Sequence, residues 1–598
     1  MNKNTVLFIV LSILVWIVYV TFILPVFVKP KTPKPKQPVA VTQPDRQKPE
    51  EKKPATTTTE SVPPVEVSVN EPELEADRVI SNSYITAVFT NKGASLKSIS
   101  LNKFKAPARK NALSLINPFQ EGKNSLGLST NDEDLSAANW QIIAPTNNQS
   151  ITFQRKTRNG LVITKQFSLY PDKYILDYRI SITNTGSSPI ATSIKFNGFS
   201  GINPEVPEHT DIKGVRGYRE KESKWTIREE FDINSLANLT KDGKTKIFKK
   251  GDDVQEKDNV IWTGLVNKYF ACVLIPNTAQ TENILVNYGF ELLTDNICML
   301  EEMERIKKSG DRIDPKMEET IKTWARNMNF YAQTKQITIA PNLGVTYDFT
   351  AYIGPKENKY LKQMPDKGIN NLLSFGFFGP ISSILMAILK LFYAVVGNYG
   401  WAIIFLTVLI KIILFPLTKK GQVSAYKMQQ LQPKIKALQE KYKNDKQKIG
   451  VEQMKLFKEY GVNPFSGCLP ILFQIPIFIG LYQALFLAIE LRQSPFMFWI
   501  TDLSQPDKLG TLPFSILGAK DLNLLPILMT ISWIAQSLTQ PKAVDPQARQ
   551  QQKIFLIMPL FSLLLFYNVP SGLTLYWFIQ TLLSVVEQVI IKRVYLKQ

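Results

Sequence analysis

Residues 399–416 read YGWAIIFLTVLIKIILFP, an apolar run with one lysine, Lys411, inside it. Lys419 and Lys420 follow and mark the point where the chain returns to water. Helix geometry of about 1.5 Å per residue places Lys411 about 12 Å inside that edge. The hydrocarbon core is about 30 Å thick, and a lysine at this depth usually faces a bundle interior or a wet cavity. The run therefore predicts a membrane helix whose cation lies in a polar pocket open to the cytoplasm.

The alternative for Lys411 is snorkelling, in which the lysine stem lies along apolar surface and the charge stays in water. The stem covers about 6 Å, which is half the required depth, so a pocket is the better explanation. Polar residues in the same apolar segment and in the two that follow it support the pocket. Thr407 precedes Lys411 by one helical turn, and the next two runs contain Gln474 and Gln536. We expect Lys411, Thr407, Gln474 and Gln536 to line a hydrated concavity.

The last apolar run adds four polar residues, Gln580, Ser584, Glu587 and Gln588. A single polar residue in a membrane helix usually forms a hydrogen bond to a neighbouring helix. Together with a cation, such residues favour a hydrated site. Glu587 and Gln588 lie near the inner end of the run, where we expect them to be interface residues.

Six membrane spans are expected in total. The first, residues 1–28, reads as an uncleaved signal anchor, and the others are expected at 399–417, 469–489, 522–538, 554–568 and 573–591. Lysine-rich and arginine-rich short loops face the cytoplasm, which places the 419–459 block, the 541–553 loop and the C-terminus inside. Residues 372–396 are then expected to lie flat on the outer interface. Lysines at 29–36 oppose this orientation, but the block at 419–459 contains eleven lysines and four acids and outweighs them.

Between these membrane segments, composition predicts a tether and a large extracytoplasmic domain. Residues 29–76 are rich in Pro, Lys, Thr and Glu, a composition that forms an extended linker. Residues 77–353 show alternating apolar runs, such as LVITKQFSLY at 161–170, separated by turns such as Asn159-Gly160. This pattern predicts an antiparallel β-sandwich, with a helical interruption over residues 314–328. Residues 354–398 form a linker that includes the interfacial helix, and 399–598 form the helical core.

The cytoplasmic block at 419–460 predicts a helical hairpin. Met428, Leu431, Ile435, Leu438 and Tyr442 recur every three or four residues, as do Val451, Met454, Phe457 and Tyr460. Asn444-Asp445 stands between them as a turn, and Pro433 is expected to kink the first helix. The hairpin is either a solvated element without a partner or a docking arm for a ribosome or targeting factor, with Met428, Asp445 and Lys446 as docking residues.

Residues for covalent or metal chemistry are scarce. The chain of 598 residues contains three cysteines and one histidine, His209, and it has no nucleotide-binding loop or catalytic triad. We therefore expect no enzyme activity, no metal site and no cofactor. Cys272 is either a buried free thiol or the partner of Cys298 in a disulfide. The net charge of +20 favours acidic partners such as anionic lipid or a ribosome.

Long motifs in the carboxy-terminal third resemble the YidC-type membrane protein insertases. They are VGNYGWAII (396–404), VLIKIILFPLT (408–418), MQQLQPKIKALQEKY (428–442), GVNPFSGCLPILFQIPIFIGLY (461–482) and FYNVPSGLTLYWFIQ (566–580). The first span, tether and β domain resemble the long form of bacteria with two membranes. The resemblance implies a chaperone and insertase of the inner membrane that acts alone or with the Sec translocon. It also implies five core helices around a hydrophilic groove and a mutarotase-like outer domain.

The resemblance assigns residues as well. Lys411 stands where the family usually has arginine; lysine keeps the charge but lacks the planar hydrogen-bonding fork. Leu472, Ile475, Phe566 and Trp577 look like the family's apolar slide for a client helix. The implied partners are nascent membrane proteins, membrane lipids, the Sec translocon and a ribosome or targeting factor. We expect the ribosome contact through the tail to be weak, because few residues follow Arg593. Sequence-specific nucleic-acid binding is not expected.

Two other classes of protein fit parts of the sequence. A transporter or channel would also place polar residues inside a helical bundle, but it usually shows repeated halves or broken helices, and we find no internal repeat. A membrane-tethered sugar enzyme would use the β domain, and turnover by the isolated 77–350 fragment would support it.

Overall fold

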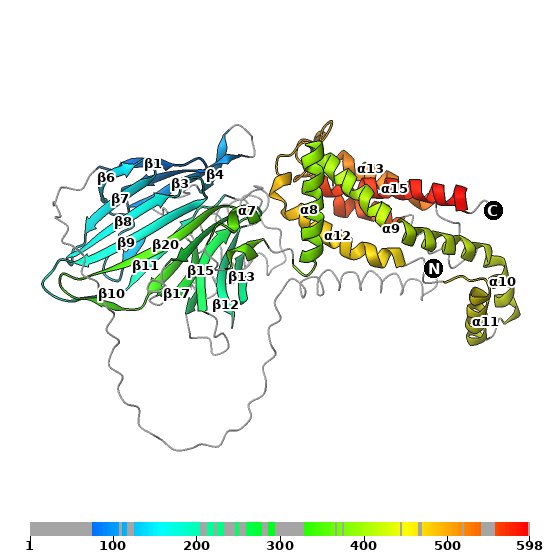
Figure 1. Ribbon diagram of the computed structural model, residues 1–598, viewed down its shortest axis with the longest axis horizontal. Coiled ribbons are helices and arrows are strands. Elements are labelled where there is room, and N and C mark those ends of the chain that lie inside the picture. Colours follow the sequence, from blue (N-terminus) through cyan, green and yellow to red (C-terminus); the bar gives the residue numbers. More distant parts are fainter. Residues whose placement is uncertain are drawn as a thin grey trace, which may run out of the picture. The chain divides into compact units, whose positions relative to one another are not determined.

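The structure is a computed structural model. It describes residues 74–106, 111–116, 125–203, 212–220, 224–232, 246–249, 259–277, 285–292, 328–364, 368–373, 376–442, 445–463, 469–516, 519–539 and 557–595. The chain forms two compact units, one of sheets that ends at Leu373 and one of helices that follows it (Figure 1). The expected first span, His209, Cys298 and most of both the tether and the interruption at 314–328 lie outside the described residues. Met328 begins a strand.

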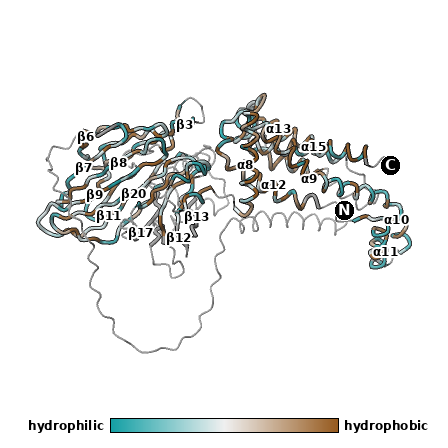
Figure 2. Tube along the Cα trace, viewed as in Figure 1, coloured by the Kyte–Doolittle hydropathy of each residue, from teal (hydrophilic) through white to brown (hydrophobic). Residues whose placement is uncertain are grey.

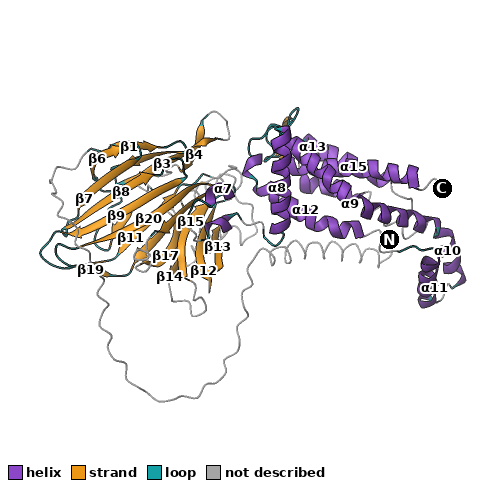
Figure 3. Cartoon of the chain, in the orientation of Figure 1, coloured by secondary structure: helices purple, strands orange, loops and turns teal. Residues whose placement is uncertain are grey.

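The first unit is built from antiparallel strands, as the alternating sequence predicts (Figure 3). Nine strands form one sheet in the order β13-β12-β15-β16-β20-β9-β8-β7-β6, and five form another in the order β14-β17-β18-β11-β5. A third sheet has the order β1-β2-β3-β4. The strands are β1 Asp77–Ser81, β2 Ile85–Thr90, β3 Ser95–Lys105, β4 Ala112–Ile116, β5 Leu128–Thr130, β6 Gln141–Asn147, β7 Ser150–Lys156, β8 Leu161–Leu169, β9 Ile175–Asn184, β10 Ile190–Thr192, β11 Ile194–Ser200, β12 Lys213–Glu220, β13 Lys224–Asp232, β14 Lys246–Lys249, β15 Asn259–Val266, β16 Phe270–Pro276, β17 Leu285–Leu292, β18 Met328–Thr334, β19 Ile337–Ile339 and β20 Gly344–Pro355. Two short helical segments, α7 (Asn358–Leu361) and η2 (Ile369–Leu372), complete the unit.

The core of this unit is aromatic. Phe167 of β8 stacks on Tyr178 of β9 with ring centroids 4.6 Å apart, and Phe89 of β2 lies 4.5 Å from Phe167. Cys272 of β16 is a fully buried free thiol, and burial raises the pKa of this thiol. The buried-thiol interpretation of Cys272 is therefore confirmed.

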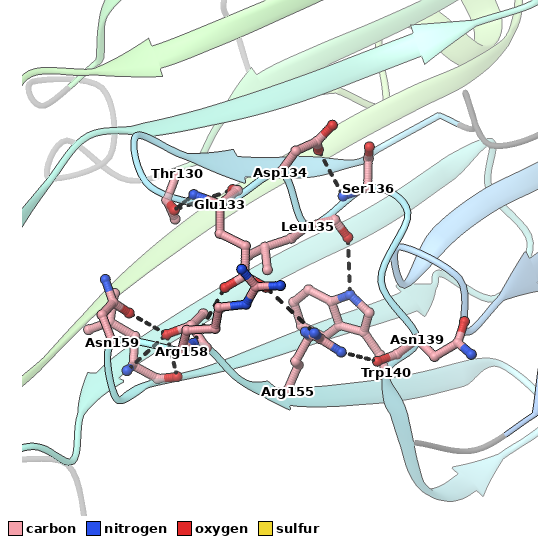
Figure 4. A network of polar contacts seen from close by, with 12 residues as sticks. Thr130, Glu133, Asp134, Leu135, Ser136, Asn139, Trp140, Arg155, Arg158 and Asn159 are labelled. Atoms are coloured by element: carbon pink, nitrogen blue, oxygen red, sulfur yellow. Dashed lines mark hydrogen bonds and ion pairs between the residues drawn. The ribbon is translucent and has the colours of Figure 1, made fainter. Parts of the chain in front are cut away.

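A polar network fastens the loop before β6 to the β7–β8 hairpin (Figure 4). The Arg155 guanidinium donates from Nη1 to the carbonyl oxygen of Asn139 at 2.5 Å, and its Nη2 lies 3.5 Å from Glu133 Oε1. Trp140 Nε1 donates to the carbonyl oxygen of Leu135 at 3.4 Å. These bonds hold Trp140 against the core, where it is fully buried.

The second unit is helical, with the apolar residues of Figure 2 concentrated in its long helices. Its elements are α8 Gly379–Val396, α9 Tyr399–Gln430, α10 Gln432–Lys441, α11 Lys446–Glu459, α12 Leu469–Leu487, η4 Ile489–Leu491, the hairpin of β21 Gly510–Ile516 and β22 Ala519–Leu522, α13 Leu524–Thr539, the helix Ile557–Phe566, and α15 Ser571–Tyr595. Among the described helices, α8, α9 and α15 are long and apolar enough to cross a membrane, while α12, α13 and Ile557–Phe566 have shorter apolar segments. Helices therefore occupy all five runs where spans of the core are expected.

The prediction that Met428 belongs to the first helix of the cytoplasmic hairpin is wrong. Helix α9 continues through Pro416 and past the membrane run to Gln430, so Met428 belongs to α9. The break comes at Leu431, and Pro433 lies in the first turn of α10 rather than at a kink. Proline fits there because the first helical N–H groups have no partner within their own helix.

Helix α8 crosses the direction of α9, α13 and α15, which run side by side (Figure 1). One face of α8 is buried through Leu385, Met386 and Leu389, and the helix contacts α9 and α12. Its other face exposes Ile384 and Leu391. Length and composition would allow α8 to span a membrane, so its flat position on the interface stays a prediction.

Hydrogen bonds close the bundle at the end where α9 begins. Asn398 caps α9, because its Oδ1 accepts from Gly400 N at 2.9 Å, and its Nδ2 donates to the carbonyl oxygen of Pro495 at 3.1 Å. The carboxylate of buried Asp507 accepts from Leu525 N at 2.7 Å and so caps α13. This end of the bundle is thus covered by the connection between α12 and α13.

Candidate functional site

Helix α15 presents a polar face to its neighbours. Steps of three, four and one residue separate its polar side chains, which places them on one side of a helix. They are Tyr576, Gln580, Ser584, Glu587 and Gln588, all of them less than a tenth exposed. We call these residues and their partners on α9, α12 and α13 the polar seam. It extends about 18 Å along the helix at about 1.5 Å per residue.

Lys411 of α9 binds the middle of the polar seam. Its Nζ donates to Ser584 Oγ at 2.6 Å and lies 3.2 Å from Glu587 Oε2. The two charged side chains are 13% and 7% exposed. Lys411 is therefore not an isolated cation but half of a largely buried ion pair.

Hydroxyl groups hold both members of this pair. Ser584, which accepts from Lys411, itself donates to the carbonyl oxygen of Gln580 at 2.9 Å. Glu587 Oε1 accepts from the hydroxyl of Thr418, two turns beyond Lys411 on α9. Each charge thus has a neutral partner on the opposite helix, in addition to its counter-ion.

Amide groups continue the polar seam on both sides of the pair. Gln474 Nε2 of α12 donates to Tyr576 OH at 2.8 Å, and Gln580 Nε2 lies 3.5 Å from Gln474 Oε1. Gln580 Oε1 is buried and has no hydrogen-bond partner among the described residues. Toward the C-terminal end of α15, the Thr539 hydroxyl of α13 donates to Gln588 Oε1.

Of the four expected groove residues, Lys411 and Gln474 enter the polar seam. Thr407 is fully buried, and its hydroxyl donates to the carbonyl oxygen of Ile403, one turn earlier in its own helix, at 2.7 Å. Gln536 of α13 is partly buried, and its carbonyl oxygen accepts from Thr539 Oγ1 at 2.7 Å. Thr407 therefore bonds within α9, and no described contact connects Gln536 to Lys411.

The expected slide residues divide into two groups. Leu472 and Ile475 lie on the outside of α12, where 65% and 45% of these residues are exposed. Phe566 and Trp577 are partly buried and contact each other with ring centroids 5.9 Å apart. Trp577 also stacks on Trp533 of α13 at 6.3 Å and lies 4.9 Å from Phe478 of α12, so it joins three helices in one aromatic cluster.

The expected docking residues lie at the end of α9 and at the start of α11. Met428 packs against a small core formed by Leu431, Ile435, Phe457 and Val462. Asp445 is the N-cap of α11, since its Oδ1 accepts from Lys448 N at 2.9 Å, and Lys446 is the first residue of that helix. An open hollow of about 1040 Å³ runs along α11 beside exposed Val451 and Met454.

Sequence reasoning grouped Ser584 with Lys411 in a hydrated site but missed the ion pair of Lys411 with Glu587. It treated Glu587 as an interface residue and did not select Thr418 or Tyr576. The spacing of the polar residues on α15 was the available signal, because one face of a single apolar helix carried all five. In the described part of the chain, no group of three His, Cys, Asp or Glu side chains is placed to hold a metal ion.

Comparisons with known proteins agree with this architecture. The family model described as "60Kd inner membrane protein" matches residues 391–598, and that described as "YidC periplasmic domain" matches residues 78–301. A membrane protein insertase YidC from Syntrophus aciditrophicus is 30% identical over 99% of this chain and 100% of its own length. The chain belongs to the YidC family of membrane protein insertases. It is accordingly an inner-membrane protein with a periplasmic-type sheet domain and a helical membrane domain.

Other YidC insertases are similarly related. That of Pelobacter propionicus is 28% identical over 88% of this chain and 90% of its own length, and that of Legionella pneumophila is 31% identical over 77% and 71%. Among solved structures, an active YidC insertase with its first transmembrane domain resolved matches with a TM-score of 0.33 and 15% identity over 86% of this chain and 92% of its own. A putative aldose 1-epimerase from Escherichia coli matches 47% of this chain and 99% of its own with a TM-score of 0.28 and 10% identity.

Proposed function

We propose that this YidC-family chain integrates inner-membrane proteins and helps them fold, alone or with the Sec translocon. The polar seam receives hydrophilic residues of a client that must cross the membrane. The apolar surface of α12 guides the client helix into lipid. No nucleotide hydrolysis enters the scheme, because burial of the client's apolar surface supplies the free energy.

The observation that carries this proposal is a charged, hydrogen-bonding seam inside an apolar bundle. A polar group that enters hydrocarbon without a partner costs several kcal/mol. Lys411, Glu587 and Gln474 offer such partners inside the apolar bundle. The seam therefore lowers the barrier for the polar part of a client.

Hydration of the seam is supported by its unsatisfied groups. Gln580 Oε1 and the indole Nε1 of Trp577 are buried without a hydrogen-bond partner among the described residues. Buried polar groups in native proteins almost always bind another polar group or water. Water or a client side chain is the natural partner for both atoms.

The exposed apolar side chains of α12 support a role as a slide for the client helix. Leu472 and Ile475 lie on one side of α12, three residues apart, and remain exposed although both are strongly apolar. A client helix that leaves the seam would contact this surface before it reaches lipid. The aromatic cluster around Trp577 gives the neighbouring wall a rigid apolar surface.

The orientation follows from charge. Lysines of α10 and α11 favour a cytoplasmic position for the hairpin. In that orientation the closed end of the bundle and the β unit are both on the periplasmic side. The basic hairpin then acts as a docking arm for a ribosome or targeting factor. Its small core, which includes Phe457, and its capping residue Asp445 keep the arm folded.

Insertion by reconstituted vesicles tests the proposal. The Lys411→Glu variant places a second carboxylate beside Glu587, so insertion of an acidic-tailed client should fall about tenfold or more, since like charges in a closed site cost several kcal/mol. The matched control is Lys390→Glu on α8, where Lys390 Nζ lies 2.5 Å from Glu490 Oε1 outside the seam. This control should insert the client within about twofold of wild type, because a partly exposed pair contributes little.

Unchanged insertion by Lys411→Glu would contradict a role for the seam. Solute flux through wild-type vesicles that insert no client would contradict the insertase function and favour a channel.

A further inference from the structure

We propose that Lys411 and Glu587 form a two-sided receptor for client charges, in which Lys411 takes up carboxylates and Glu587 takes up lysine or arginine side chains. Each residue is the resident counter-ion of the other, so a client charge must displace one of them. This inference rests on the proposed insertase function. It predicts that Glu587 sets the charge preference of the site.

The contacts of Lys411 and Glu587 would allow a client charge to take the place of one of the two residues in the ion pair. Lys411 Nζ is closer to the Ser584 hydroxyl, at 2.6 Å, than to the Glu587 carboxylate, at 3.2 Å. Glu587 in turn keeps the Thr418 hydroxyl on its other oxygen. When the ion pair opens, each charge retains a hydrogen bond to a hydroxyl group of the protein.

The ammonium group of Lys411 has three N–H bonds. Two of them are directed at Ser584 and Glu587. The lysine side chain is 13% exposed and the glutamate 7%. A client carboxylate can therefore approach Lys411 before Glu587 leaves. A client cation can approach Glu587 in the same way, although less of that side chain is exposed.

A neutral resting pair has a physical advantage over a lone cation. A buried unpaired charge is strongly destabilising, whereas a pair with good hydrogen bonds largely offsets its own desolvation. A client charge that displaces one resident partner pairs with the other, while the displaced charge keeps its hydroxyl partner, Ser584 for Lys411 or Thr418 for Glu587. A site with Lys411 alone would bind acidic residues only and repel basic ones.

Charge-matched clients test the inference. A single-span client carries Asp, Asn or Lys at one position of its translocated tail, and vesicles contain wild type or Glu587→Gln. Glu587→Gln removes the competing carboxylate, so insertion of the Asp client relative to the Asn client should rise about fivefold. Insertion of the Lys client relative to the Asn client should fall about fivefold. A change of this size corresponds to a charge interaction of moderate strength. The control, Glu490→Gln, removes the partner of Lys390 outside the seam and should leave both ratios unchanged.

Both ratios unchanged in Glu587→Gln, with normal insertion of the Asn client, would overturn the inference and leave the insertase function intact. If wild type inserts no client, the proposed function fails instead. Should Glu587→Gln not accumulate, Glu587→Asp retains the charge on a shorter stem farther from Lys411. It should shift both ratios in the same directions by a smaller factor, and the absence of a shift would overturn the inference.

Discussion

Lys165 of β8 is a second buried lysine, and its setting contrasts with that of Lys411. It is fully buried, and its Nζ lies 3.1, 2.7 and 2.8 Å from the carbonyl oxygens of Gly93, Ala94 and Leu126. Aromatic rings of the core surround it, with the Trp140 ring centroid 5.4 Å away. Two of these bonds join the β2–β3 turn to β8, and the third joins β8 to the segment before β5.

Replacement of this amine by an apolar side chain should destabilise the β unit. The Lys165→Met variant removes the lysine donor from the buried carbonyl oxygens of Gly93 and Ala94, and it leaves the carbonyl oxygen of Leu126 with only the Tyr178 hydroxyl at 3.5 Å. This loss costs about 1–3 kcal/mol of unfolding free energy. Chemical denaturation of the full chain in detergent measures the loss. Lys92→Met, which removes an exposed pair with Glu75, should stay within about 0.5 kcal/mol of wild type.

The same residue predicts a dependence on pH. Burial lowers the pKa of Lys165 well below its usual range, whereas an exposed lysine has a pKa of about 10.4. The unfolded chain therefore binds the proton more tightly, and stability rises with pH between the lowered pKa and about 10.4. The unfolding free energy of wild type relative to Lys165→Met should increase from about pH 7 to about pH 9.5. A constant difference would contradict the assignment.

At the residue scale, the sequence identified Lys411 but not its counter-ion. The depth of a residue in the membrane can be counted along its helix from the membrane edge, and this count predicted that Lys411 lies well inside the membrane. The partner depends on how α9 and α15 are rotated and shifted against each other, which spacing within either helix does not determine. The same limit explains Thr407, whose hydroxyl bonds to its own helix.

At the element scale, apolar periodicity predicted the helices of the core better than their ends. The membrane run was expected to stop near Pro416, yet α9 continues to Gln430. Thr418 follows the proline, and its hydroxyl lies 3.1 Å from the carbonyl oxygen of Phe415 and also donates to Glu587. A composition change from apolar to lysine-rich marks the membrane edge and not the end of a helix.

Two glycines in these helices give a matched test of packing. A Cβ at Gly400 would lie 2.0 Å from the Phe496 ring, whereas one at Gly450 of α11 would meet no atom within 4 Å. Gly400→Ala should therefore force apart α9 and the loop that covers the bundle, with a loss of about 1–3 kcal/mol. Gly450→Ala should stabilise α11 by about 1 kcal/mol. Thermal stability of the purified variants in detergent measures both, and a similar response of the two would contradict the close packing at Gly400.

At the scale of the whole molecule, composition divided the chain correctly into a sheet unit and a helical unit. Strand alternation predicted the antiparallel sheets, since each strand buries one set of side chains. The position of α8 was harder to predict, because an apolar helix of eighteen residues can span a membrane or lie along it. Loop charges favour the interface, and the placement of α8 relative to the membrane stays a prediction.

Cysteine labelling tests the central claim, that water reaches the polar seam from the cytoplasm. Ser584→Cys, in a chain whose native cysteines are replaced, places a thiol of similar size beside Lys411. A membrane-impermeant thiol reagent added to inside-out vesicles should label this cysteine, whereas Thr407→Cys, at a fully buried position on α9, should stay unlabelled. Labelling of Ser584→Cys only after the bundle is unfolded would show that the seam is dry and would contradict the account.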